Sequence, residues 1–182
     1  MRTAFRHEVR APSHRKVPKM NRLPAAALAL LLASPACAQK AKVAIFDFEL
    51  VDTSLEGELT GAKSAEQARL AGMAVALRQK LGASDRYDVV DIAPVAAHAR
   101  AQNLQACGRC DASMARELGA DLAMTGTVQK VSNLILNINI YIRDANSGAV
   151  IDAMSADIRG NTDESWSRGL NWLVRNKLLA PQ

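Results

Sequence analysis

One stretch of alternating residues constrains the fold of this chain more than any other feature. In LILNINIYIR, residues 134–143, apolar side chains are separated by the polar set Asn137, Asn139, Tyr141 and Arg143. Successive side chains of a β-strand point to opposite faces of the sheet. The period of two therefore predicts a half-buried strand, with its isoleucines on a core and its polar side chains toward water.

Five strands and four helices are expected, in the order β-α-β-α-α-β-β-β-α. The strands are predicted at residues 41–50, 86–92, 120–132, 134–143 and 149–159. The helices are predicted at residues 64–81, 94–104, 111–118 and 162–178. Strands separated by helices should pair in parallel, and the last three should form an antiparallel meander. The expected fold class is α/β (α+β), a single mixed β-sheet with helices packed on it.

Residues at the ends of the helices support these bounds. Asp111 and Thr162 are N-cap candidates, and Gly119 is placed where a helix would stop. Gly126 lies inside a predicted strand, which indicates a bulge or a close backbone approach. The acidic segment VDTSLEGELTGAKS that follows the first strand has neither helical nor strand periodicity, so it is expected to be a loop.

The first 38 residues have the pattern of a signal peptide. A basic segment precedes an apolar run, and Ala36-Cys37-Ala38 provides a small-x-small cleavage site. Residues 1–19 are either an extended basic region or the result of a start codon assigned too early, with Met20 as the true start. We expect residues 39–182 to form one domain.

This leader indicates an exported, periplasmic protein that is not integral to the membrane once mature. An outer-membrane lipid anchor on Cys37 is the less favoured alternative, because Ser34 stands where the lipidation signal normally has Leu. The chain has 23 Lys or Arg and 18 Asp or Glu residues, of which seven bases and one acid lie in residues 1–38. The remaining 16 bases and 17 acids give a charge of about −1, so no nucleic-acid partner is expected.

Several segments together resemble a known family. They are KVAIFDFE, LRQKLGASDRYDVVD, the C-x-x-C-D motif, and ARELGADLAMTGTVQKVSNLILNINIYIRDANSGAVIDA. From about Lys42 to Leu178 the chain resembles the domain shared by the N-terminal part of TolB and by CsgG-type envelope proteins. It is most similar to secreted bacterial proteins of unknown function in that group.

The resemblance implies a non-catalytic periplasmic module that acts by contact with an envelope or periplasmic protein. It implies neither an enzyme nor a cofactor. CsgG-type pores need long membrane-inserting hairpins, for which this chain has no room, so an accessory or adaptor protein is the better expectation. Neither the partner's identity nor the oligomeric state follows from the sequence.

Cys107 and Cys110 form the C-x-x-C pair. In an oxidising compartment they are expected to be joined as a structural clip between two helices. A thiol-disulfide oxidoreductase is the alternative, because a helix N-terminus lowers the pKa of a thiol. A metal site is the weakest interpretation, because His98 is the one histidine after the leader and no second cysteine pair is present.

The acidic residues near the first strand raise a third possibility, a small-ligand or cation sensor. Asp47, Glu49 and Asp52 are weak candidates for holding a hard cation such as calcium, but their spacing lacks the EF-hand order. No catalytic constellation is recognised, because no nucleophile motif accompanies the lone histidine.

The polar face of the alternating strand is the preferred candidate for a contact surface. Asn137, Asn139, Tyr141 and Arg143 would present a flat hydrogen-bonding surface, and Asn and Tyr are common in adaptable recognition surfaces. Trp172 lies outside the apolar stripe of the last helix and is a candidate contact anchor. A merely solvated sheet face is the alternative interpretation.

Overall fold

The computed structural model describes residues 39–181 of the chain. The predicted signal peptide, the Met20 start and the Cys37 anchor lie outside the described residues and stay predictions. Within residues 39–181, none of the helices has both the length and the apolar character needed to cross a bilayer.

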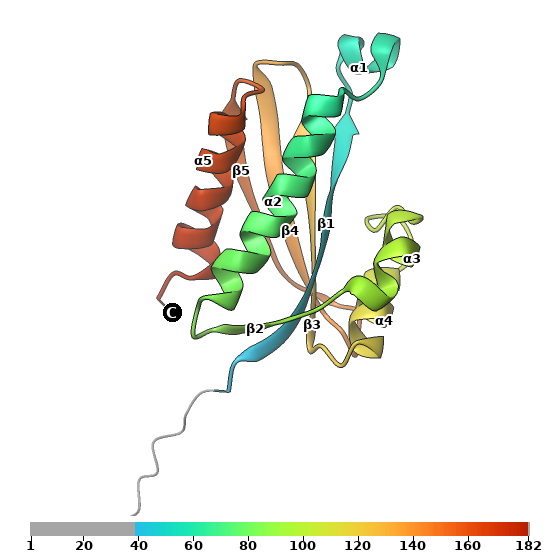
Figure 1. Ribbon diagram of the computed structural model, residues 1–182, viewed down its shortest axis with the longest axis vertical. Helices are drawn as coiled ribbons and strands as arrows, with labels where there is room; N and C mark the ends of the chain where they lie inside the picture. Colours follow the sequence, from blue (N-terminus) through green and yellow to red (C-terminus); the bar gives the residue numbers. More distant parts are fainter. Residues whose placement is uncertain (1–38, 182) are drawn as a thin grey trace, which may run out of the picture. The chain divides into compact units, whose positions relative to one another are not determined.

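The strands form one mixed sheet in the order β2-β1-β3-β4-β5 (Figure 1). Their bounds are β1 (Ala41–Asp52), β2 (Tyr87–Val90), β3 (Leu122–Lys130), β4 (Ile135–Asp144) and β5 (Val150–Arg159). β1 pairs in parallel with β2 and β3, and β3, β4 and β5 pair antiparallel. The predicted fold class and strand pairing are therefore confirmed.

The helices follow the predicted order, with one addition. They are α1 (Leu55–Thr60), α2 (Ser64–Gly82), a 3-10 turn η1 (Ala93–Val95), α3 (Ala96–Arg100), α4 (Cys110–Glu117) and α5 (Asp163–Leu173), which continues as the π-helical turn η2 (Val174–Leu178). α1 lies within the segment expected to be a loop. It forms because the Ser54 hydroxyl accepts a hydrogen bond from the Gly57 N–H and caps the helix.

Two helix ends differ from the prediction. The helix expected to reach residue 104 ends at Arg100, and the Asn103 side chain then accepts hydrogen bonds from the N–H groups of Gln105 and Ala106. Such a local turn competes with helix continuation. Asp111 is not an N-cap, because α4 begins at Cys110. Thr162 caps α5 as predicted, accepting from the Ser165 N–H.

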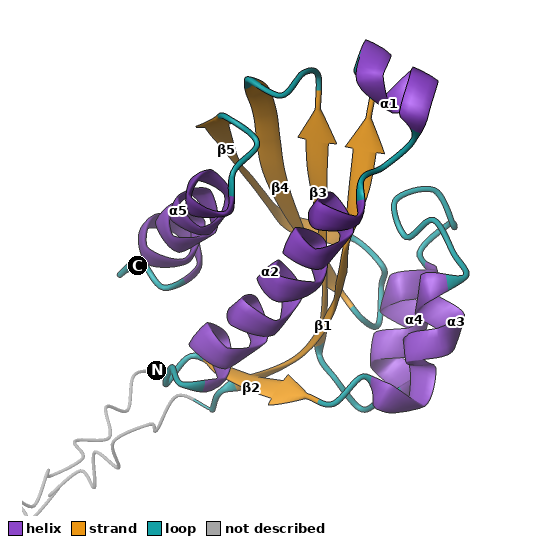
Figure 2. Ribbon diagram, turned by 45° about the horizontal axis from the view of Figure 1, so that its top comes forward, coloured by secondary structure: helices purple, strands orange, loops and turns teal. Residues whose placement is uncertain are grey.

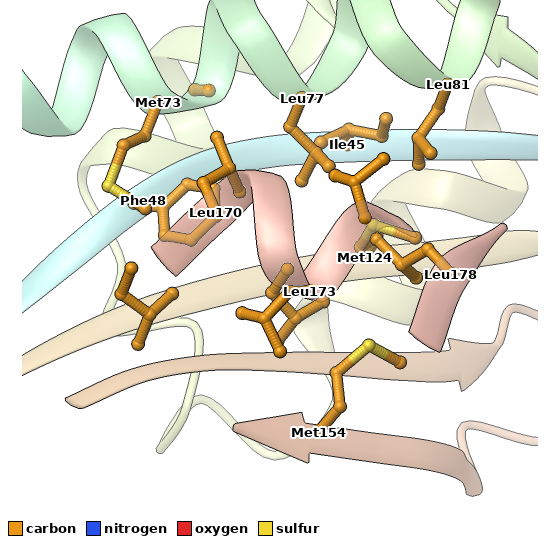
Figure 3. Close-up of a cluster of buried hydrophobic side chains, with 14 of the residues drawn as sticks. Ile45, Phe48, Met73, Leu77, Leu81, Met124, Met154, Leu170, Leu173 and Leu178 are labelled. Atoms are coloured by element: carbon orange, nitrogen blue, oxygen red, sulfur yellow. The ribbon is translucent and has the colours of Figure 1, made fainter. Parts of the chain in front are cut away.

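The main core lies between the sheet and the pair α2 and α5 (Figure 3). The predicted apolar stripe of the last helix is buried there: Trp166, Leu170, Leu173, Val174 and Leu178. All four alternating residues of β4 from Leu136 to Ile142 are buried against the same core. The alternation in β4 therefore places its apolar side chains on the core, as the sequence predicts.

A smaller core lies on the opposite face of the sheet. It packs Phe46 of β1 and Ala123 of β3 against residues from η1, α3 and α4, such as Met114. β1 has an irregularity between Ile45 and Phe48, where its register against β3 shifts. Phe46 therefore points to one face and Phe48 to the other.

Gly126 marks a close approach, one of the two alternatives expected from the sequence. A Cβ atom there would lie 2.2 Å from Cε1 of the Phe48 ring. No other residue would leave room for this ring against β3.

Candidate interaction surface

One part of the sheet is not covered by helices. α2 and α5 cover the main-core face, whereas α3 and α4 cover the other face only beside β1 and part of β3 (Figure 2). The opposite side of β4 and β5 therefore faces solvent. We call this region the open face and define it by four side chains: Asn137, Asn139, Tyr141 and Asp157.

The structure brings three of the predicted contact residues together on the open face. Asn137, Asn139 and Tyr141 are half-buried and point away from the main core, because the residues between them are buried on the other side. Thr125 lies opposite Tyr141 on β3, and Ala153 lies opposite it on β5. Because Ala153 is small, the side of the Tyr141 ring toward β5 is accessible.

Hydrogen bonds across strands hold the two asparagines in place. Asn137 Nδ2 donates to Asp157 of β5 over 2.7 Å, and Asn139 Nδ2 donates to the Thr127 hydroxyl of β3 over 3.3 Å. Within residues 39–181, no side chain hydrogen-bonds to the Tyr141 hydroxyl, which leaves this group available to a partner.

Arg143 has a different role from the one expected. Its Nε lies 3.1 Å from Oδ2 of Asp111, which is fully buried in the first turn of α4. The two groups form an ion pair, but their angles do not make a good hydrogen bond. Arg143 also donates to the Gly148 carbonyl over 3.4 Å. We infer that Arg143 ties α4 to β4 and is not free to recognise a partner.

The disulfide loop borders the open face. Cys107 and Cys110 form a disulfide with Cα atoms 5.6 Å apart, within the loop and the first residue of α4. The Leu104 N–H donates to Glu49 of β1, and the Gln105 side chain donates to Thr125 of β3. The disulfide thus joins this loop to α4. A clip between two helices was expected, but α3 already ends at Arg100, so Cys107 lies in the loop.

Trp172 lies on the other side of the sheet from Tyr141. It is 42% exposed and borders a groove of about 470 Å³ between β5 and α5. Lys177 Nζ lies 6.0 Å from the centre of its ring. The two predicted contact sites therefore do not form one surface, because the edge of β5 separates them.

The weak cation candidates each have a protein partner. Asp47 accepts from Arg78 over 2.7 Å and from Arg100 over 3.0 Å. Burial alone would raise the pKa of the Asp47 carboxyl, but these two arginines lower it below its usual value. Glu49 accepts a hydrogen bond from the Leu104 N–H, and Asp52 forms an ion pair with Lys130. In the described part of the chain, no group of three or more potential ligands could hold a metal ion.

A buried charge cluster at the end of β3 was not predicted from the sequence. Lys130 is fully buried, and its Nζ lies 2.7 Å from Glu66 of α2, 3.0 Å from Asp52 of β1 and 3.2 Å from Glu56 of α1. The signal was available, because Lys130 continues the inward-facing positions of its strand. A lysine at such a position needs a carboxylate partner.

The cluster also lowers the pKa values of its carboxylates. The hydrogen bonds from Lys63, Asn133 and Lys130 lower the pKa of Glu56 to about 2. Burial alone would raise the pKa of Glu66, but Lys130 and its other hydrogen-bond partners lower it. The same bonds, acting against burial, raise the pKa of Lys130. All these groups therefore stay charged near neutral pH.

Comparison with known proteins assigns the chain to a family. The family model DUF3280, described as "Protein of unknown function (DUF2380)", matches residues 41–178, from β1 to the end of η2. The chain belongs to the DUF3280 family. A search of curated proteins found no match to this DUF3280 chain.

The solved structures that match this chain have low sequence identity to it. The LpoB C-terminal domain from Salmonella enterica is 14% identical, with 70% of this chain and 87% of that chain covered and a TM-score of 0.46. Lipoprotein GNA1162 from Neisseria meningitidis is 18% identical, with 74% and 91% covered and a TM-score of 0.46.

TolB from Acinetobacter baumannii is also similar. It is 12% identical, with 78% of this chain but only 29% of the TolB chain covered, and the TM-score is 0.40. At such TM-scores these matches carry no argument about function. The specific resemblance to TolB and to CsgG-type proteins stays a prediction for this DUF3280 protein.

Proposed function

We propose that this protein is a non-catalytic binding module of the cell envelope, which is exported to the periplasm and acts by contact with another protein. The observation that carries the proposal is the open face. Helices cover the rest of the sheet, whereas here ordered polar side chains and an accessible tyrosine remain toward solvent.

Exposed apolar side chains at the end of this face support the proposal. Val51, Val131 and Ile135 are 42%, 52% and 46% exposed. By the alternation of their strands they lie on the same side as Asn137, since their neighbours Leu50, Lys130 and Leu136 point to the main-core side. Neighbouring exposed apolar residues beside polar ones are typical of protein interaction sites.

Photocrosslinking from Tyr141 tests this proposal. Benzoylphenylalanine would replace Tyr141 in the full chain, in cells that produce and export it, and crosslinked proteins would be identified by mass spectrometry. Val75, on the outer side of α2, is the control position, and at 50% exposed it is more accessible than the half-buried Tyr141. We expect a defined crosslinked protein from position 141 and not from position 75.

A substitution then checks the same contact. Tyr141→Ala should reduce co-purification of the crosslinked protein with an unchanged circular dichroism spectrum, whereas Val75→Ala should leave co-purification intact. Equal crosslinking from both positions, or none from either, would contradict the proposal.

A thiol-disulfide oxidoreductase is the second candidate, and one observation favours it. Cys110 is the first residue of α4, where the helix dipole favours a thiolate. The reduction potential of the Cys107–Cys110 pair distinguishes the two functions. A potential below about −300 mV indicates a structural clip, and one of about −120 to −200 mV indicates a redox enzyme.

A further inference from the structure

The first turn of α4 is held by the disulfide and not by a capping side chain. The side chain of the N-cap residue, Arg109, makes no capping hydrogen bond. Instead, the Cys110 N–H donates to the Cys107 sulfur over 3.2 Å. One of the unpaired N–H groups at the start of the helix is thus satisfied by a sulfur atom, and the disulfide fixes the position of that atom.

The backbone between the two cysteines has a costly conformation. Gly108 has a φ of 68° and Arg109 a φ of 76°, and within residues 39–181 Arg109 is the one non-glycine residue with positive φ. Such a conformation persists only where the surrounding structure enforces it. Here the ring closed by the disulfide enforces it, together with an exposed hydrogen bond from Arg109 to the Ser147 carbonyl. Opening the ring therefore allows Arg109 to relax.

The residue after Cys110 carries the buried carboxylate that pairs with Arg143. The side chains of Asp111 and Arg143 are 1% and 20% exposed. Neither oxygen of the Asp111 carboxylate makes a well-aligned hydrogen bond, and the Nε of Arg143 makes none either. Buried polar groups are normally satisfied, and the exceptions include strained and redox-linked sites. The pair therefore depends on where the first turn of α4 places Asp111.

Arg143 belongs to the same side of β4 as the open face. It follows Tyr141 by two positions, and the pairing of β4 with β3 is regular through both residues. Their side chains therefore leave the strand in the same direction, about 6.8 Å apart. The ion pair with Asp111 directs the Arg143 guanidinium to α4 and away from a partner on the open face.

The next turn of α4 has its own anchors. Met114 and Ala115 are buried in the smaller core and do not depend on the cysteines for their packing. Loss of the disulfide therefore acts on the first turn, which holds Cys110 and Asp111, and leaves the rest of the helix on the sheet.

We propose that the Cys107–Cys110 disulfide is a redox switch that controls Arg143. In the oxidised protein, the first turn of α4 keeps Asp111 on Arg143. Reduction removes the sulfur cap, the first turn unwinds, and the Arg143 guanidinium joins Tyr141 on the open face as a further hydrogen-bond donor. The inference rests on the proposed binding function, because it concerns regulation of the same surface.

The reductant that the switch requires is a protein dithiol. One of its thiolates attacks the Cys110 sulfur, which forms a mixed disulfide and releases Cys107 as a thiolate. The Cys110 N–H already points at this sulfur and stabilises its negative charge. The second thiolate then attacks the reductant's own sulfur in the mixed disulfide and releases Cys110. Two electrons and two protons pass to the cysteine pair, and the dithiol becomes a disulfide.

Arginine modification by phenylglyoxal, located by mass spectrometry, tests the switch. The full chain, produced and exported by cells, is compared with its disulfide intact and after reduction with dithiothreitol, which is removed without oxygen. The modification rate of Arg143 should rise about fivefold or more on reduction, the factor expected when a helix loses its cap. Arg78 of α2 is the internal control, because its side chain is 26% exposed and is also paired, with Asp47. Its rate should not change.

Variants separate the two steps of the switch. Asp111→Asn keeps the disulfide but removes the ion pair, so Arg143 should react rapidly in both redox states. Cys107→Ser/Cys110→Ser cannot close the ring, so Arg143 should react rapidly with or without reductant. Glu117→Gln, at the exposed end of α4, is the matched control and should respond to reduction like the parent protein.

The reaction of the parent protein decides the inference even where a variant does not fold. A constant rate at Arg143 on reduction would overturn it. An equal rise at Arg78 would also overturn it, because it would show a general loosening of the fold.

Crosslinking from position 141 in both redox states separates this inference from the proposed function. A rise at Arg143 without any crosslinked protein in either state would support the switch and contradict the proposed function. A crosslinked protein together with a constant rate at Arg143 would support the proposed function and overturn the switch.

Discussion

Lys130 shows how one residue links distant parts of the chain. Its Nζ holds carboxylates from three elements, and the Glu66 carboxylate is itself fully buried. Glu66 also accepts from Asn161 in the loop before α5. Removing one partner of such a cluster leaves buried charge without compensation, which costs more than the cluster itself contributes.

Lys130→Met should therefore destabilise the protein strongly. We expect a loss of about 3–5 kcal/mol in the free energy of unfolding, measured by urea denaturation. The double variant Lys130→Met/Glu66→Leu should recover part of this loss, because both buried charges are removed. Lys80→Met, at the exposed end of α2, is the control and should change stability little. A loss in the double variant as large as in the single one would contradict this account.

At the scale of elements, α4 is held to the sheet by several links. The Asp111–Arg143 pair joins it to β4, and Met114 and Ala115 pack on β1 and β3. The disulfide joins its first residue to the preceding loop, and that loop is bound to Glu49 and Thr125. The helix is only eight residues long, so these links and not its own propensity keep it in place.

Reduction of the disulfide should lower stability moderately. The chain-entropy model gives a loss of about 2 kcal/mol for so short a loop. Urea denaturation with and without dithiothreitol measures the difference. The variant Cys107→Ser/Cys110→Ser should match the reduced protein and should not respond to dithiothreitol. A response of the serine variant would show that the reductant acts elsewhere.

At the scale of the whole molecule, the charge cluster makes stability depend on pH. Asp52, Glu56 and Glu66 all have a pKa below the usual value in the folded state. Their contribution to stability is therefore full above the pKa of the unfolded chain, about 4, and is lost as the pH falls through the folded pKa values.

Thermal unfolding followed across pH tests this linkage. The melting temperature should fall between about pH 4.5 and pH 2, the range that separates the unfolded pKa of a glutamate from the folded value of Glu56. Glu56→Gln should reduce the dependence. Glu58→Gln is the matched control, because Glu58 is exposed on the same helix and outside the cluster. Equal pH profiles for the two variants would contradict the assignment.

Local patterns were enough to predict most of the elements. The alternation in β4, the stripe in α5 and the cap at Thr162 depend on neighbours within a few residues, so the sequence shows them directly. α1 was missed because six residues with no buried side chain have no apolar period. The end of α3 was misplaced because the turn at Asn103 overrides the helix-forming residues that precede it.

The sequence by itself determined the order of the elements along the chain, the parallel and antiparallel pairing, and the face of β4 that meets the core, because these follow from periodicity and short connections. Only the tertiary structure decided that Lys130 meets Asp52 and Glu66, which are 78 and 64 residues away along the chain. It also decided that Arg143 pairs with Asp111 and so is not part of the open face, and that Trp172 lies across the sheet from Tyr141. Charge pairing and the coverage of the sheet by helices depend on how distant elements pack together, and this packing cannot be inferred from a local sequence pattern.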